Sequence, residues 1–168
     1  VSRGLGDVYK RQGITLDALH IHQSPDNWRQ VMDTNVNAIF YWNQILIEPM
    51  MMQGSGSVVL MSSVTGVKGN TGQSAYGASK AAMIGLARTL AIELGRFGVR
   101  VNCLLPGYID TDIMAEIPKE KRGALRQTIP MKRFGKAEEI SGAVAWLVSG
   151  DSTYMTGQTL VLDGGLSA

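Results

Sequence analysis

The apolar and polar residues of this chain fall into segments whose periods predict helices and strands in alternation. Between residues 28 and 47, apolar residues recur every three or four positions, which is the period of a helix that buries one face. The sequence Ser-Pro-Asp at positions 24–26 supplies an N-cap, a proline for the first turn and an acid at the positive end of the helix dipole. We expect Pro49 to break or kink this helix before the three methionines at 50–52, which we interpret as packing residues.

Three apolar runs further along the chain have the length and flanking residues of buried strands. The predicted strands span residues 57–62, 99–105 and 159–162. The helices predicted between them span residues 73–96 and 137–148. The stretch 108–130 is polar and charged around one short helix. Strands that alternate with helices predict an α/β fold with a parallel sheet.

The composition is that of one ordinary globular domain. At 168 residues the chain is one domain at most, and 45% hydrophobic and 18% charged residues are usual for a soluble fold. The formal net charge of +2 is close to neutral and the bases are scattered, so no nucleic-acid-binding surface is indicated. One group of bases is either a solvated helix face or a patch that attracts an acidic carrier protein or phosphate: Lys119, Lys121, Arg122 and Arg126.

Few residues are suited to metal or redox chemistry. The single Cys103 excludes an internal disulfide and a cysteine-based metal site, and its place in an apolar run predicts a small buried hydrophobe. His20 and His22 lack an accompanying carboxylate or thiol constellation, and we interpret them as loop or surface residues. No apolar run approaches the ~20 residues that a membrane span needs. A reduced, cytoplasmic setting is the default expectation.

The candidate chemistry lies between Ser63 and Lys80. Ser63 ends the first predicted strand, at the edge where open α/β sheets bind their ligands. Tyr76 and Lys80 are four residues apart on the next helix and therefore share a face. An ammonium beside a phenol favours phenolate, so we expect Lys80 to lower the pKa of Tyr76 from about 10 and make it a usable acid and base near neutral pH.

These residues and their spacing resemble the short-chain dehydrogenase/reductase family, which has a Rossmann-type fold and uses nicotinamide cofactors. In that family a Ser, a Tyr-x-x-x-Lys pair and an upstream Asn form the catalytic set, and the matching positions here are Asn35, Ser63, Tyr76 and Lys80. For Asn35 two interpretations stand: a buried Asn that bonds to backbone, or one that also holds a water linked to Lys80.

The resemblance extends over residues 13–168. The sequence Pro-Gly-Tyr-Ile-Asp-Thr at 106–111 resembles the segment that contacts the nicotinamide end of the cofactor, and 154–165 fit the family's closing turn, last strand and Gly-Gly. The cofactor-binding residues so implied are Asn35, Tyr76, Lys80, Pro106, Gly107, Ile109 and Thr111. The fold implied is the C-terminal part of a doubly wound parallel sheet, with about three strands and helices on both faces. The family also suggests that 108–130 close over substrate, the alternative being an ordinary surface helix.

Within the family, segments 13–15, 68–73 and 129–135 most resemble the 3-oxoacyl-(acyl-carrier-protein) reductases. This implies NADPH-dependent reduction of a 3-oxoacyl thioester held by acyl-carrier protein or CoA, with NAD not excluded. It also implies a homodimer or homotetramer formed through helix 73–96, whose small residues permit close approach of another backbone. The alternatives are another short-chain reductase, acting on acetoacetyl-CoA or a different ketone or alcohol, and a non-catalytic binding protein derived from the family.

The first twelve residues do not fit this resemblance. The family begins with a strand, a glycine-rich turn and a helix that hold the cofactor pyrophosphate, whereas residues 1–12 contain glycines without a flanking strand or helix. We interpret 1–12 as a non-native segment that resembles translated sequencing adapter, or alternatively as the remnant of a large natural deletion. Residues 13–168 are then a partial catalytic domain without the dinucleotide-binding half. We expect such a chain to leave the strand at 57–62 without a neighbour, to bind cofactor poorly and to turn nothing over.

Overall fold

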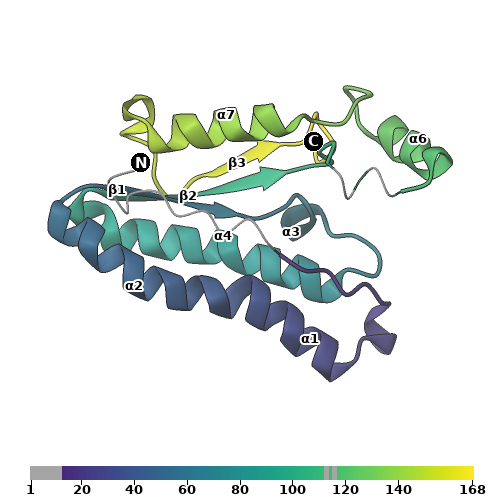
Figure 1. Ribbon diagram of the computed structural model, residues 1–168, viewed down its shortest axis with the longest axis horizontal. Coiled ribbons are helices and arrows are strands. Elements are labelled where there is room, and N and C mark those ends of the chain that lie inside the picture. The colour runs from purple at the N-terminus through teal and green to yellow at the C-terminus, as the bar shows by residue number, and fades with distance from the viewer. Residues whose placement is uncertain (1–12, 112–113, 115–116) are drawn as a thin grey trace.

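The computed structural model describes residues 13–111, 114 and 117–168, so the interpretation of residues 1–12 lies outside the described part of the chain. Its centre is a parallel sheet of three strands in the order β1-β2-β3 (Figure 1). The strands are β1 (Gly56–Met61), β2 (Val99–Pro106) and β3 (Thr159–Leu162). The predicted α/β fold, as a fragment of a Rossmann-type sheet, is confirmed.

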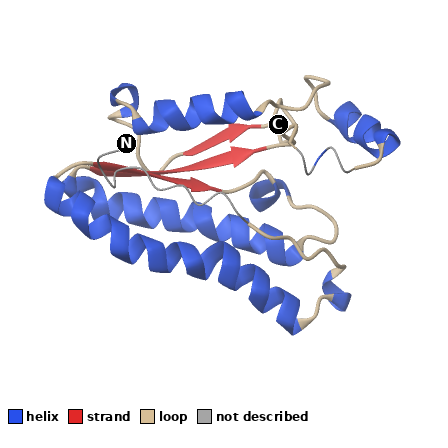
Figure 2. Ribbon diagram, viewed as in Figure 1, coloured by secondary structure: helices blue, strands red, loops and turns tan. Residues whose placement is uncertain are grey.

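Helices cover both faces of the sheet, as Figures 1 and 2 show. On one face lie α1 (Pro25–Met32), α2 (Ala38–Gln53) and α4 (Ser74–Leu94), and on the other lies α7 (Ala137–Val148). The shorter elements are η1 (His20–His22), the π-helical turn η2 (Asp33–Asn37), α3 (Thr65–Lys68), η3 (Gly95–Phe97), α6 (Lys119–Thr128) and η4 (Gly150–Ser152). Within the described residues, no helix combines the length and the apolar character that crossing a bilayer requires.

The core lies on the two sides of β2, because successive side chains of a strand point to opposite faces. Val101, Cys103 and Leu105 are fully buried in the cluster that includes α4, whereas Leu104 packs with Val144 and Leu147 of α7. Burial of this kind contributes about 1.5–3 kcal/mol for each large apolar side chain. The middle strand is therefore what fixes the two helical layers relative to each other.

The helix containing Pro49 does not end where the sequence indicated. Helix α2 continues through Pro49 to Gln53 and ends at Gly54, whose φ of 73° gives a left-handed C-cap. Proline removes one helical hydrogen bond to the residue four positions earlier, here the exposed Ile45, where water can take the place of the donor. Burial of Met50 beyond the proline holds the last turn in place, so the expected break is wrong, and the alternative of a kink stays a prediction.

Strand β1 forms an edge of the described sheet. It pairs with β2 from Gly56↔Val99 to Met61↔Leu104, and no other described strand pairs with it. An apolar groove of about 220 Å³ runs beside it, lined in part by Trp42 and Leu46 of α2. Whether the strand lacks a neighbour in the folded protein, as expected from the sequence, stays a prediction.

Candidate active site

A cleft of about 600 Å³ opens at the carboxyl ends of β1 and β2. Its wall includes all but one of the residues predicted for the site: Ser63, Tyr76, Lys80, Pro106, Gly107, Ile109 and Thr111. The exception is Asn35, which is only 1% exposed and is not part of the wall. Gly13 and the first two turns of α7 complete the lining.

Ser63 and Tyr76 both line this cleft. Ser63 follows the end of β1, where its hydroxyl accepts a hydrogen bond from the amide of Thr65 at 3.2 Å and turns the chain into α3. Tyr76 lies in the first turn of α4, half-buried. Burial raises the pKa of Tyr76, a hydrogen bond with the Ser63 hydroxyl lowers it, and the charge of Asp17 raises it, with a net upward shift.

The expected effect of Lys80 on Tyr76 is therefore wrong for this structure, and the position of the ammonium explains why. Lys80 Nζ donates a hydrogen bond to the carbonyl oxygen of Met61 at 2.9 Å and lies 5.5 Å from the centre of the Tyr76 ring. Burial lowers the pKa of Lys80 to about 8. The ammonium is bonded to the end of β1, Lys80 is not among the groups that shift the pKa of Tyr76, and burial has the largest effect on that pKa.

Ser62 contacts the backbone of Lys80, and Gly13 lies against its ammonium group. The Ser62 hydroxyl donates to the backbone carbonyl of Lys80 at 2.7 Å, which fastens this turn of α4 to the end of β1. A Cβ placed on Gly13 would stand 3.0 Å from Lys80 Nζ and 3.2 Å from Asn35 Oδ1. A side chain at position 13 would therefore force Lys80 or Asn35 to move from its present position.

Asn35 belongs to the π-helical turn η2, a rare local structure that often marks functional sites. Its Oδ1 accepts from the amide of Ile14 at 2.8 Å, and its Nδ2 donates to the carbonyl of Ile14 at 3.0 Å. The same Nδ2 group donates to Ser79 Oγ at 3.0 Å. The backbone bonds foreseen for a buried asparagine are present, and the water link to Lys80 stays a prediction.

The segment from Pro106 to Thr111 leaves β2 and forms the opposite wall of the cleft. The amide of Gly107 donates to the carbonyl of Leu162 at 2.9 Å, and a Cβ on Gly107 would stand 2.7 Å from Asp163 Cβ. A side chain at this position would push β2 and the end of β3 apart. The absence of a side chain at Gly107 therefore lets the segment that carries Ile109 and Thr111 lie close to the end of β3.

Sequence reasoning missed the contributions of Gly13, Ser79 and α7. The signal for α7 was present: a helix that connects two parallel strands begins at their carboxyl edge, where the ligand site lies. The roles of Gly13 and Ser79 depend on contacts between distant segments, which no local pattern reveals. Among the described residues, no group of three His, Cys, Asp or Glu side chains is placed to hold a metal ion.

Comparisons with known proteins identify the family of the chain. A family model described as enoyl-(acyl carrier protein) reductase matches residues 8–167. The 3-oxoacyl-[acyl-carrier-protein] reductase of Thermotoga maritima is 41% identical over 154 residues, covering 92% of this chain and 63% of the relative. The chain thus spans less than two thirds of the length of this relative.

Solved structures show the same fold. The 3-oxoacyl-[acyl-carrier protein] reductase of Brucella melitensis superposes with a TM-score of 0.90 at 33% identity, covering 93% of this chain and 60% of that one. A gluconate 5-dehydrogenase of Burkholderia cenocepacia, solved with NADP and tartrate, gives a TM-score of 0.88 at 29% identity, covering 94% of this chain and 62% of that one. The chain belongs to the short-chain dehydrogenase/reductase family of oxidoreductases, among relatives that include the 3-oxoacyl-[acyl-carrier-protein] reductases.

Proposed function

We propose that the intact protein is a cytoplasmic enzyme that reduces a 3-oxoacyl thioester, carried by acyl-carrier protein, to the 3-hydroxyacyl thioester with NADPH. The observation that carries this proposal is the meeting of Ser63, Tyr76 and Lys80 with the segment 106–111 on one cleft. The similarity to the Thermotoga maritima and Brucella melitensis reductases supports the substrate class.

The cleft fits the nicotinamide end of such a cofactor. It offers the hydroxyls of Tyr76 and Thr111, the ammonium of Lys80 and the backbone of the segment 106–111. When bound, the cofactor supplies a hydride for the carbonyl carbon of the substrate. The preference for NADP is supported by the NADP complex of the Burkholderia cenocepacia relative.

Tyr76 is the proposed proton donor to the carbonyl oxygen. The phenol is protonated at neutral pH and so has a proton to give, but burial raises its pKa and makes it a weaker acid than the sequence indicated. Ser63, on the wall of the same cleft, donates a hydrogen bond to the same oxygen and stabilises the charge that develops on it in the transition state. Lys80 holds the nicotinamide ribose, and Asn35 supports a water that returns a proton to the site.

The proposed oligomer is a homodimer or homotetramer that pairs α4 and α2. The outer side of α2 exposes Phe40, Tyr41 and Ile45, which are 49%, 61% and 66% accessible. On α4, a Cβ at Gly85 would meet nothing within 4 Å. An exposed apolar helix face and an open backbone position on another helix are both suited to close packing against a second copy.

A second candidate, reduction of a sugar acid or another small ketone, is favoured by the structural match to the gluconate 5-dehydrogenase. A chimaera that joins the N-terminal part of the Thermotoga maritima relative, up to its matched region, to residues 13–168 separates the two. Its NADPH oxidation is followed with 3-oxoacyl-carrier protein, acetoacetyl-CoA and 5-ketogluconate. Turnover with the thioesters alone supports the proposal, and turnover with the ketogluconate alone overturns it.

The 168-residue chain itself is proposed to be inactive, and residues 1–12 to be foreign to the parent protein. Sequencing the source DNA upstream of the Gly13 codon tests the second part. A strand, glycine-rich turn and helix encoded there would make 1–12 an artefact. An initiating codon continuous with the twelve residues would overturn that interpretation.

A further inference from the structure

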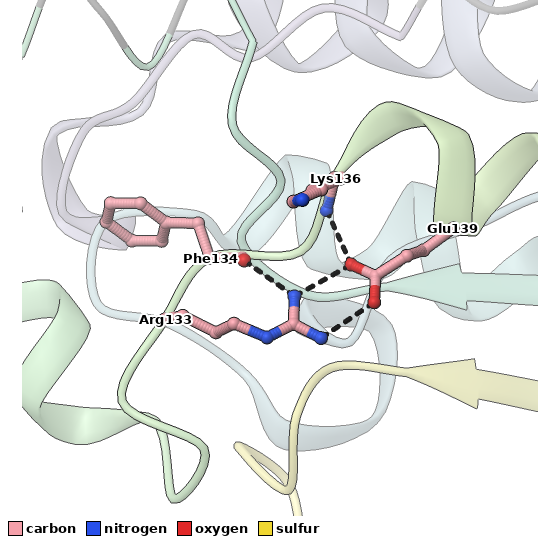
Figure 3. Close-up of polar contacts among 4 residues, drawn as sticks. All are labelled: Arg133, Phe134, Lys136 and Glu139. Atoms are coloured by element: carbon pink, nitrogen blue, oxygen red, sulfur yellow. Dashed lines mark hydrogen bonds and ion pairs between the residues drawn. The ribbon is translucent and has the colours of Figure 1, made fainter.

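An ion pair outside the cleft links the loop before α7 to the first turn of that helix. Arg133 Nη1 lies 2.8 Å from Glu139 Oε2, and Arg133 Nη2 lies 2.7 Å from Glu139 Oε1, a two-point contact between guanidinium and carboxylate (Figure 3). The pKa of Glu139 is lowered to about 2 by the hydrogen bonds from Arg133 and from the amide of Lys136. The carboxylate is therefore charged at every pH at which the protein would act.

Arg133 and Glu139 also form hydrogen bonds with the backbone on either side of Gly135. Arg133 Nη1 donates to the carbonyl of Phe134 at 3.1 Å, and the amide of Lys136 donates to Glu139 Oε2 at 2.7 Å (Figure 3). Phe134 and Lys136 are the two neighbours of Gly135. The ion pair thus closes a ring of hydrogen bonds that brackets this glycine on both sides.

Gly135 in turn is paired with the segment that carries the cofactor-facing residues. Its amide donates to the carbonyl of Tyr108 at 2.9 Å, and its carbonyl accepts from the amide of Asp110 at 2.8 Å. A Cβ at Gly135 would stand 2.6 Å from Ile109 Cδ1, so the side chain of Ile109 lies directly on the glycine. Gly135 therefore fixes Ile109 through both of its backbone groups and by direct packing.

An exposed ion pair of this kind contributes little to global stability. The side chains of Arg133 and Glu139 are 45% and 43% accessible, so solvent screens the attraction between the two charges. What a two-point Arg–carboxylate contact adds is orientation, because its two parallel hydrogen bonds allow only one arrangement. The effect of the pair should therefore be local to the backbone that it brackets.

We propose that Arg133 and Glu139 are positioning residues: they hold Gly135 in the geometry that places Ile109 on the wall of the cleft. Neither residue lines the cleft itself. The consequence for cofactor affinity rests on the proposed function, whereas the link from the ion pair to Gly135 and Ile109 does not. The two parts are tested separately.

The first test measures hydrogen exchange of single backbone amides in the 168-residue chain by NMR. Glu139→Gln removes the charge and one acceptor while keeping the shape. We expect exchange of the Gly135 and Asp110 amides to accelerate by about tenfold, with less than about a twofold change at core amides such as that of Leu105. The matched control is Asp26→Asn, which breaks another exposed Arg–carboxylate contact in a first helical turn, between Arg29 and Asp26 at 2.6 Å.

A second pair of variants covers the case in which Glu139→Gln disturbs folding. Arg133→Lys keeps the charge but not the planar fork and should also loosen the two amides. The double exchange of Arg133→Glu with Glu139→Arg should restore part of their protection. Unchanged amides in both single variants, or equal acceleration throughout the sheet, would overturn the positioning role.

The second test uses the chimaera with NADPH. Glu139→Gln should raise the KM for NADPH severalfold while kcat changes less, and Asp26→Asn should change neither. Loosened amides with an unchanged KM would refute the link to the cofactor while leaving the link to Gly135 intact. A chimaera that is inactive before any substitution would count against the proposed function and not against the amide result.

Discussion

The side-chain amide of Asn35 donates a hydrogen bond of 3.0 Å to the hydroxyl of Ser79, which donates in turn to the carbonyl of Tyr76 at 2.7 Å. The π-helical turn that carries Asn35 is thereby joined to the helix that carries Tyr76. Ser79 is completely buried and Asn35 is 1% exposed, so no water can replace either partner without a rearrangement. Asn35 and the backbone of Tyr76 are thus joined by one buried polar connection through Ser79.

Ser79→Ala should lower the free energy of unfolding by about 1–3 kcal/mol, because one donor of the Asn35 amide is left buried without an acceptor. Urea denaturation measures the change. Thr89→Ala is the control, since Thr89 makes a similar bond to the carbonyl of Gly85 on the same helix but is exposed. We expect the control to stay within about 0.5 kcal/mol of the wild type. Equal small effects in both variants would argue against the buried connection.

Tyr76 should titrate above its ordinary pKa of about 10, because burial raises it. A phenol whose pKa is raised on folding stabilises the fold below the unfolded value, and that contribution is lost as the pH rises through the folded value. Phenolate absorbance of the wild type minus that of Tyr76→Phe isolates this group. Ser63→Ala removes the hydrogen bond that lowers the pKa and should move the titration still higher. A titration below pH 10 would show that Lys80 governs the phenol after all.

Cys103 should be inert towards thiol reagents in the folded chain. Its side chain is completely buried in β2, and burial raises the pKa of the thiol to about 11. Since the thiolate is the reactive form, labelling with a disulfide reagent at pH 8 should require denaturant. Rapid labelling without denaturant would mean that β2 opens readily to solvent.

Gly85→Arg should prevent self-association through α4, because it places a long cation where a Cβ meets open space. Light scattering coupled to gel filtration is the measurement, applied to the chimaera. Gly142→Arg, at an equally open position on α7, is the matched control and should leave the oligomer intact. If both variants keep the mass of the wild type, the proposed interface is elsewhere.

Local patterns in the sequence were sufficient for most of the fold. The helix predicted at 137–148 is α7 with the same bounds, and the strand predicted at 159–162 is β3. The helix has the apolar period of a one-sided helix, and the strand is a short apolar run. Pro49 was misjudged because the burial of Met50 beyond it is a tertiary contact, which propensity alone does not contain.

The sequence predicted only part of the candidate site. Ser63, Tyr76 and Lys80 were found because their spacing and the strand edge bring them together. The sign of the pKa shift of Tyr76 was predicted wrongly. It depends on the position of Lys80 Nζ, which here bonds to the carbonyl of Met61. The support of Ile109 by Gly135 joins segments that have no common periodicity, and only the folded chain reveals it.

Tyr76 as the proton donor is the central claim, and one comparison tests it most directly. The chimaera and its Tyr76→Phe variant are assayed for NADPH oxidation with a 3-oxoacyl-carrier protein. Tyr154→Phe serves as the control because this tyrosine is fully exposed. We expect Tyr76→Phe to lower kcat by about 10²–10⁴-fold with an unchanged circular dichroism spectrum, and Tyr154→Phe to have no effect. Near-normal turnover by a folded Tyr76→Phe variant would contradict the account.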